Sequence, residues 1–329
     1  MNVTWLRRLV TRGGVPGVLI AGGVVLICML VHRRDRALAA LLGLLLLVGI
    51  ALKLNVGSHQ IGMHRPQAIP LRVTFLDVGK GDAVVIETPG GGTIVVDTGG
   101  TLRDGDDQAN RAIIPYLQSR GVRHIGALLL THPHPDHIGG AATLIERYPI
   151  NFLLDNGVDS SLPEFRRYRE AARERDVEYH QMRRGSRLET SDGVRLTAIA
   201  PPQSLTQGWI NNSSIVLRLE YGRNVFLLTG DAETESEGEI LRSGQPLVCD
   251  VLKVGHHGGK QSSSAEFVAA ARPRIAVISV NANNRNGHPA PEVLARLKEA
   301  GAEIYRTDQH GDITCIGNGE TIRVETARR

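Results

Sequence analysis

Two long apolar runs, at 15–31 and 37–52, dominate the start of the chain and are separated by a short basic segment. A membrane-spanning helix needs about 17–25 apolar residues, so each run is at the short end of that range. We therefore expect 1–54 to form a membrane hairpin of two short transmembrane helices, with 55–70 as a linker. The alternative is a cleaved signal peptide followed by a buried helix, and the first run lacks the small-residue cleavage site that this requires.

Beyond residue 70, short apolar segments alternate with amphipathic ones. The apolar segments predict strands at 71–77, 83–88, 93–97, 125–131, 152–154, 194–200, 214–221, 224–229, 247–254, 274–280, 303–306 and 312–316. Apolar residues at helical spacing predict helices at 108–119, 136–147, 163–175, 233–241, 264–271 and 291–300. Strands interleaved with helices favour a layered α/β sandwich over 71–329.

The net charge of +4 comes from the N-terminal segment. Residues 1–70 carry eight Lys or Arg and one Asp, whereas 71–329 carry 30 basic and 33 acidic residues. The globular part is thus slightly acidic, which excludes a generally basic nucleic-acid-binding surface. The charged helix at 163–175 indicates a solvated face, with a local rim for anionic substrates as the alternative. Three cysteines exclude a disulfide framework, and Cys249 and Cys315 either pair or stay as buried thiols.

The strongest chemical signal is the segment Thr-His-Pro-His-Pro-Asp-His at 131–137, which follows an apolar strand. His132 and His134 are two residues apart in a stretch that the prolines keep extended, so their side chains point the same way. Asp136 and His137 follow on the first turn of the next helix. Three imidazoles and a carboxylate suit Zn²⁺ or another first-row divalent ion, so we expect a metal site here.

Further candidate ligands stand where apolar strands end. Asp97, Asp231 and the pair His256 and His257 each close or follow such a strand. Each of these residues alone is also typical of a helix cap or a hydrogen-bonded core residue. Because all of them follow strands as the 131–137 segment does, we expect them to share one cleft with it.

This set of residues resembles the ligand set of the metallo-β-lactamase superfamily. Four segments resemble, more narrowly, the C-terminal domain of ComEC-type competence proteins: Phe-Leu-Asp-Val-Gly-Lys-Gly-Asp-Ala at 75–83, Asn-Asn-Ser-Ser at 211–214, Val-Gly-His-His-Gly at 254–258 and Gly-His-Pro-Ala-Pro at 287–291. The resemblance covers essentially all of 71–329. It implies a four-layer αββα sandwich with a metal cleft at the edge of two sheets, and hydrolysis of esters, amides or phosphodiesters.

The resemblance also implies two divalent metal ions, Zn²⁺ or Mn²⁺, and a role for each candidate ligand. The first ion would be held by His132 and His134. The second would be held by a mixed group, namely Asp136, His137 and one of the pair His256 and His257. Asp231 would bridge the two ions.

Three acidic residues are expected beside the ligands rather than on the metal: Asp77, Asp82 and Asp97. Of these, Asp97 would orient His132 or His134. Superfamily members with a full first site usually supply a third histidine before the bridging aspartate. This chain has Asn211, Asn212 and Ser213 there, which we expect to bind substrate or to complete a looser site that favours harder ions such as Mn²⁺. Lys80 and Gly259 stand where the competence proteins usually have Gln and Ser.

A divalent ion lowers the pKa of a bound water to about 7, which makes that water a nucleophile. Asp136 and Asp231 would hold this water, and Lys253 or His288 would stabilise the charge that develops. His288 would alternatively donate a proton to the leaving oxygen, or simply pack its loop. Two serines, Ser262 and Ser263, precede a predicted helix whose backbone N–H groups suit a phosphate oxygen.

The sequence therefore predicts a membrane-anchored metal-dependent phosphodiesterase or nuclease that acts on DNA, with single-stranded DNA or another phosphodiester as the expected substrate. The alternatives are a hydrolase of another ester, thioester or lactone, and a non-catalytic membrane-tethered DNA-uptake module. Two membrane helices are too few for a channel, so the chain works either beside a separate DNA-uptake channel protein or independently. Balanced arginines around the hairpin leave its orientation open. The resemblance places the hydrolase domain on the outer face of the inner membrane.

Overall fold

The computed structural model describes residues 70–102, 105–204, 210–282 and 285–328. The expected membrane hairpin and nearly all of the expected linker lie outside these ranges. Among the helices of the described ranges, none has the length and apolar character needed to cross a bilayer.

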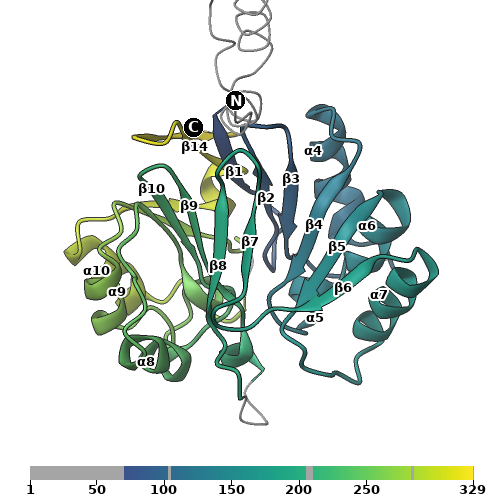
Figure 1. Ribbon diagram of the computed structural model, residues 1–329. Coiled ribbons are helices and arrows are strands. Elements are labelled where there is room, and N and C mark those ends of the chain that lie inside the picture. Colours follow the sequence, from purple (N-terminus) through teal and green to yellow (C-terminus); the bar gives the residue numbers. More distant parts are fainter. Residues whose placement is uncertain (1–69, 103–104, 205–209, 283–284, 329) are drawn as a thin grey trace, which may run out of the picture. The chain divides into compact units, whose positions relative to one another are not determined.

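Two β-sheets form the centre of the described part (Figure 1). The first contains β1 (Leu71–Phe75), β2 (Val84–Glu87), β3 (Thr93–Val96), β4 (Ile125–Leu130), β5 (Ile150–Asp155), β6 (Glu178–Gln181), β14 (Ile313–Gly317) and β15 (Ile322–Thr326). The second contains β7 (Arg187–Glu189), β8 (Arg195–Ala200), β9 (Val216–Tyr221), β10 (Asn224–Leu228), β11 (Val251–Lys253), β12 (Ile275–Ile278) and β13 (Glu303–Arg306). Their strand orders are β15-β14-β1-β2-β3-β4-β5-β6 and β13-β12-β11-β10-β9-β8-β7.

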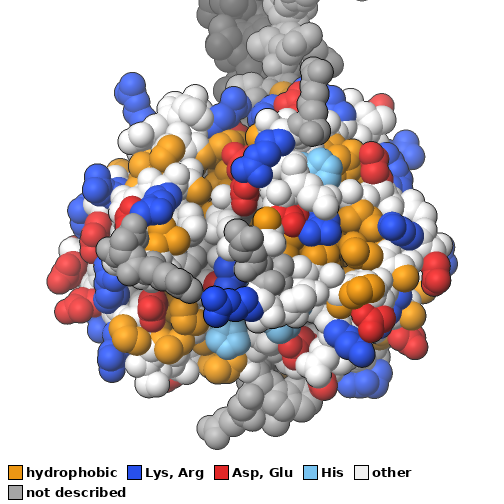
Figure 2. All heavy atoms as spheres, turned by 180° about the vertical axis from the view of Figure 1, so that it is seen from behind, with side chains coloured by type: hydrophobic (Ala, Val, Ile, Leu, Met, Phe, Trp, Pro, Cys, Tyr) orange, Lys and Arg blue, Asp and Glu red, His pale blue; other side chains and the backbone are white. Residues whose placement is uncertain are grey.

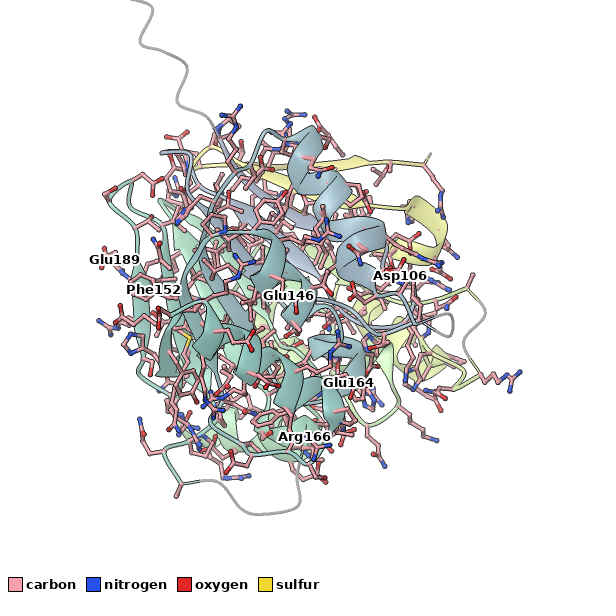
Figure 3. All side chains as sticks on the ribbon, turned by 90° about the vertical axis from the view of Figure 1, so that its right-hand side faces the viewer. Asp106, Glu146, Phe152, Glu164, Arg166 and Glu189 are labelled. Atoms are coloured by element: carbon pink, nitrogen blue, oxygen red, sulfur yellow. The ribbon has the colours of Figure 1, made fainter. Side chains whose placement is uncertain are left out.

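Helices cover the outer face of each sheet, which confirms the expected four-layer sandwich (Figure 1). The first half of the chain contributes η1 (Ala109–Ile113), α4 (Ile114–Ser119), α5 (Pro135–Ile138), α6 (Ala141–Arg147) and α7 (Pro163–Glu174). The second half contributes η2 (Asn211–Ser213), α8 (Thr234–Arg242), η3 (Gly255–Gly258), α9 (Ala265–Ala271), α10 (Pro291–Glu299) and α11 (Thr307–His310). Figure 3 shows α6 and α7 from outside, with Glu146 and Arg166 on their exposed side.

The central strands are apolar along their whole length because both of their faces are buried. In β4, Leu128 belongs to the core beneath the outer helices, whereas Leu129 belongs to the core between the two sheets. Successive side chains of a strand point to opposite faces, so one continuous apolar run serves both cores. Phe226 of β10 completes the inner core from the second sheet.

The structure departs from the predicted elements in two ways. The predicted helix 136–147 is divided into α5 and α6 at Gly139, where a Cβ would lie 2.4 Å from the backbone nitrogen of Thr101. Only glycine permits this approach of two backbones. The edge strands β6, β7 and β15 were not predicted, because their mostly exposed or half-exposed residues carry no apolar pattern.

Candidate metal centre

Strand direction collects the candidate ligands at one end of the sandwich. Strands β3 to β6 run parallel, and so do β10 to β13. The loops that follow β3, β4, β10 and β11 carry Asp97, the 131–137 segment, Asp231 and the His256–His257 pair. In open sheets of this kind, sites form beyond the carboxyl ends of the strands.

The loop after β4 presents four of these side chains. His134 has extended backbone angles (φ −83°, ψ 144°), and α5 begins at Pro135. Proline suits this first helical position because its missing N–H would have no partner inside the helix. Asp136 and His137 then lie on the same turn, and His132 and His137 are buried.

Two groups of possible metal ligands come together at this end. Within each group, one ligand atom from every residue lies within 4.8 Å of the others. The first group consists of His132, His134 and Asp231, and the second consists of Asp136, His137 and His257. A third, overlapping group consists of Asp82, His137 and Asp231. The first two groups match the ligand sets that the family resemblance implied.

Several ligand atoms in these groups are buried without a hydrogen-bond partner among the described residues. They are Oδ1 of Asp82 and Asp231 and Nε2 of His137 and His257. Leaving a buried polar atom unsatisfied costs about 1–3 kcal/mol. Nitrogen and oxygen donors that converge in this way are the donor set of a first-row divalent ion, so the residues fit a metal.

Asp231 belongs to the first and third groups, and its carboxylate also lies close to imidazoles of the second. It follows Gly230, whose φ of 53° turns the chain at the end of β10. Its Oδ2 atom lies 3.2 Å from Nε2 of His137, 3.6 Å from Nε2 of His257 and 3.8 Å from Nε2 of His132. This is the position that a bridging carboxylate requires.

Protonated imidazoles balance the buried carboxylates. Burial opposes the charged form of His137, but Asp231 and Asp97 outweigh it and raise its pKa well above the ordinary value. At His257, Asp231 and Asp136 likewise outweigh burial and raise the pKa. Burial would raise the pKa of Asp231, but His137 and His257 hold it well below its usual range. A bound cation would displace these protons.

The buried carboxylate of Asp97 orients a different histidine from the one expected. It accepts hydrogen bonds from the backbone N and Oγ1 of Thr131, both at 2.7 Å, and its Oδ2 lies 2.8 Å from Nδ1 of His137. The expected direct contact with His132 or His134 is absent from the described hydrogen bonds, and Asp97 reaches His132 only through Thr131, whose Oγ1 lies 3.1 Å from Nδ1 of His132. The reason is tertiary, because α5 folds back over the end of β3 and brings His137 to Asp97. A carboxylate on Nδ1 leaves Nε2 free to bind metal.

The loop after β11 forms a left-handed turn that presents two histidines. His256 and His257 have φ values of 43° and 52°. Nδ1 of His257 lies 3.0 Å from the carbonyl oxygen of Ser279, and its Nε2 belongs to the second ligand group. His256 is less buried, and its Nδ1 lies 2.8 Å from Oε1 of Glu233. His257 is thus the member of the pair that completes a ligand group.

Glu233 is a site residue that sequence reasoning missed. Its Oε1 also accepts a hydrogen bond from Asn211 Nδ2 at 2.9 Å, and its backbone N donates to Asn212 Oδ1 at 3.0 Å. A signal was present, since a carboxylate two residues after Asp231 stands at the start of a predicted helix. Its partner is set by a turn conformation that the sequence does not reveal.

Lys253 does not have the role expected of it. Its side chain is only 2% exposed, forms an ion pair with Asp82 and donates to the carbonyl oxygen of Gly230 at 3.0 Å. The ammonium group is therefore enclosed and engaged, so the prediction that Lys253 stabilises charge on a substrate is wrong. Asp82, by contrast, does lie beside the ligands, with Oδ1 3.5 Å from Nδ1 of His257.

Asp77 is also placed away from its expected role. Its carboxylate accepts from the backbone N of Gly79 at 3.3 Å and pairs with Arg328 at 3.1 Å, and its backbone N donates to Asp312. These contacts tie the loop after β1 to the C-terminal strand region. The prediction that Asp77 supports the metal ligands is therefore wrong.

The two serines expected at a phosphate-binding helix start are buried. The hydroxyl of Ser262 donates to the carbonyl oxygens of Gly255 and Gly259, and the backbone N of Ser263 donates to Glu237. Since these groups already have partners inside the protein, a substrate phosphate has no access to them. The predicted substrate contact is wrong, and Ser262 instead supports the turn that carries His256 and His257.

The segment that stands in place of a third histidine is engaged with α8. Asn212 Nδ2 donates to Glu235 at 3.1 Å, and Asn211 donates to Glu233 as described. Ser213 is buried, and its hydroxyl donates to the carbonyl oxygen of Ile210 at 2.6 Å. Ser213 is thus excluded from substrate contact, and both amides are tied to neighbouring carboxylates.

Lys80 and His288 lie at the more open side of the site. Lys80 Nζ is 3.3 Å from Oδ2 of Asp136, and its side chain is largely exposed. The His288 ring packs edge-on against His256 with centroids 5.3 Å apart, and burial lowers the pKa of His288. Burial likewise lowers the pKa of His134. Histidine side chains reach the surface beside Lys or Arg in the lower part of Figure 2.

Comparison with known proteins assigns the family. Residues 76–282 match the model of the metallo-beta-lactamase superfamily, so the chain belongs to that superfamily. Within it, the chain carries the domain of the ComEC-type competence proteins, as the motifs predicted. ComE operon protein 3 of Bacillus subtilis (strain 168) is 35% identical over an alignment of 254 residues, and the match covers 73% of this chain and 32% of that protein.

Two further relatives give the same picture. Recombination protein 2 of Haemophilus influenzae is 32% identical over 257 residues, or 78% of this chain and 30% of that protein. Competence protein ComA of Neisseria gonorrhoeae is 31% identical over 252 residues, and the match covers 75% of this chain and 33% of that protein. The chain thus spans about a third of the length of these relatives. The family and the ligand groups together support a metallohydrolase that binds divalent metal.

Proposed function

We propose that this protein is a metal-dependent phosphodiesterase whose substrate is single-stranded DNA. The observation that carries the proposal is the meeting of two ligand groups at Asp231, which belongs to the first group and lies 3.2 and 3.6 Å from the imidazoles of His137 and His257 in the second. Two ions held by these groups would stabilise the charge on the oxygens that attack and leave in phosphodiester cleavage. The names of the relatives, which refer to competence and recombination, support DNA as the substrate.

The residues around the ions have distinct roles in this proposal. When bound, Zn²⁺ or Mn²⁺ supplies Lewis acidity and lowers the pKa of water. Asp231 and Asp136 accept hydrogen bonds from the attacking water and so orient it. Lys80 attracts the substrate phosphate, because it is an exposed cation beside Asp136. His288 donates a proton to the leaving oxygen from the open side of the site.

We further propose that the apolar runs at 15–31 and 37–52 anchor the protein in the inner membrane, with the hydrolase domain on the outer face. The support is the length and apolar character of the two runs, together with the competence-type family. A nuclease in this place would act on DNA that enters the cell beside a separate uptake channel. Protease digestion of intact spheroplasts tests the orientation, because an outer domain is digested and an inner one is protected.

Cleavage of a labelled single-stranded oligonucleotide tests the activity. The purified full-length protein is stripped of metal by a chelator and assayed with and without added Mn²⁺ or Zn²⁺. We expect cleavage that depends on the ion and falls at least a hundredfold in His132→Ala and Asp231→Asn. His124→Ala is the matched control, because His124 is an exposed histidine at the opposite end of β4.

The same preparations distinguish the substrate classes. Parallel assays use a bis-aryl phosphate, a thioester and a β-lactam, each with the same ions. Full activity of His132→Ala on the oligonucleotide would refute the proposal. Ion-dependent turnover of the thioester or lactam, without cleavage of the oligonucleotide or the bis-aryl phosphate, would show that the protein is a hydrolase of another ester, thioester or lactone. Stoichiometric metal without turnover of any substrate would favour a non-catalytic module.

A further inference from the structure

The first ligand group offers only three protein ligands, His132, His134 and Asp231. Zinc in proteins takes at least four ligands, and a site with three protein ligands keeps one position for water or another group. A fourth imidazole, that of His256, stands next to this group. Its Nε2 lies 4.0 Å from Oδ2 of Asp231, only slightly farther than the 3.8 Å of His132.

His256 is held in the manner of a metal ligand. Its Nδ1 lies 2.8 Å from Oε1 of Glu233, as Nδ1 of His137 lies 2.8 Å from Oδ2 of Asp97. A carboxylate on Nδ1 fixes the proton there, orients the ring and leaves the Nε2 lone pair for a metal. Oε1 of Glu233 joins His256 to the amide of Asn211, from which it accepts a hydrogen bond at 2.9 Å.

The backbone supports the same assignment. His256 and His257 both adopt the left-handed conformation, which is uncommon for residues other than glycine. Strain of this kind persists where the surrounding structure imposes it, and it concentrates at functional sites. The turn directs His257 into the second ligand group, while Nε2 of His256 lies 4.0 Å from Oδ2 of Asp231, a member of the first group.

We propose that His256 is a ligand of the ion held by His132, His134 and Asp231, and that Glu233 is the positioning residue that holds it there. His256 lies outside the three compact ligand groups, so its ring moves inward when the ion binds. Its side chain is 28% exposed, less enclosed than the buried His132. The segment 211–213 thus contributes to the first site indirectly, through the hydrogen bond of Asn211 to Glu233. This inference rests on the metal centre proposed above.

Cobalt titration of the metal-free, full-length protein tests the assignment without any activity assay. Co²⁺ absorbs visible light with an intensity that depends on the number and type of its ligands. Wild-type protein should bind two ions. His256→Asn should bind the first ion at least 10–100-fold more weakly and with a changed spectrum, since even loss of a supporting residue has an effect of this size. Asparagine is chosen because it tolerates left-handed backbone.

A second pair of variants separates positioning from folding. Glu233→Gln should weaken binding of the first ion to a smaller extent than His256→Asn does. Glu235→Gln should leave the affinity for that ion unchanged, because Glu235 is hydrogen-bonded to Asn212 and not to His256. Circular dichroism of each variant checks that the fold is retained. The double variant His134→Ala/His256→Asn should bind the second ion as well as His134→Ala does, because both residues serve the first ion.

The outcomes are distinct for the two proposals. Wild-type protein that binds no ion would overturn the metal centre and this inference together. Two ions in wild type, with unchanged affinity and spectrum in His256→Asn, would overturn this inference alone. Loss of the second ion rather than the first in His256→Asn would also overturn this inference. If His256→Asn fails to fold, the affinity of Glu233→Gln for the first ion tests the inference instead.

Discussion

The buried ion pair between Lys253 and Asp82, beside the metal ligands, offers a sharp test of how much a buried charge pair contributes to the stability of the fold. The two side chains are 2% and 3% exposed. Lys253→Met keeps most of the side-chain volume and removes the charge, so Asp82 is left as a buried carboxylate without its cation. The hydrogen bond from Nζ to the carbonyl oxygen of Gly230 is lost as well.

The structure sets the expected size of the effect. Removing one partner of a buried ion pair costs about 3–5 kcal/mol. Two imidazoles offset part of this cost, since Nδ1 of His257 and Nδ1 of His137 lie 3.5 and 3.9 Å from the carboxylate of Asp82. We therefore expect a loss of about 3 kcal/mol in the free energy of unfolding. At about 2–4 °C per kcal/mol, the midpoint of thermal unfolding falls by roughly 6–12 °C.

Urea unfolding followed by circular dichroism measures this loss in the metal-free protein. The control is Lys260→Met, which breaks an exposed ion pair with Glu292 at 3.4 Å and should cost under about 1 kcal/mol. The double variant Asp82→Asn/Lys253→Met should be more stable than the sum of its single variants implies, because it leaves no unpaired charge. Equal stability of Lys253→Met and Lys260→Met would refute the reasoning.

Three further predictions concern the same end of the molecule. Asp97→Asn should weaken metal binding by about 10–100-fold, measured by calorimetry, because His137 loses the carboxylate that orients it; unchanged affinity would contradict this role. Gly139→Ala should destabilise the fold by about 2 kcal/mol or more in urea unfolding, since its Cβ would overlap backbone atoms. Gly238→Ala on α8 is the control and should stabilise by up to about 1 kcal/mol. Metal binding near pH 7 should release protons and tighten as pH rises, because the raised pKa values of His137 and His257 keep both protonated without metal. Calorimetry in buffers of different ionisation enthalpy measures the protons released. Binding without proton release would contradict the raised pKa values.

Three of the wrong predictions share one physical origin. Lys253, Ser262 and Ser263 are polar residues next to candidate ligands, and polar residues near a site were expected to meet substrate. The structure buries all three and gives each a partner inside the protein. Proximity along the chain therefore did not reveal which side of a strand end faces the cleft.

The sequence alone determined the chemical identity of the site and the apolar pattern of the central strands. Three imidazoles and a carboxylate within six residues have few uses other than metal binding, and buried strands must be apolar on both faces. Both features are local, so no knowledge of the fold was needed to read them. The edge strands escaped detection because half-exposed residues are under no such constraint.

The tertiary structure decided which of these residues meet. The parallel strands bring Asp231, the 131–137 segment and His257 to one end, although they are distant along the chain. The left-handed turn at 256–257 separates two adjacent histidines, and the fold of α5 gives Asp97 to His137. Such choices depend on backbone angles and on contacts between remote segments, which no local pattern of residue types specifies.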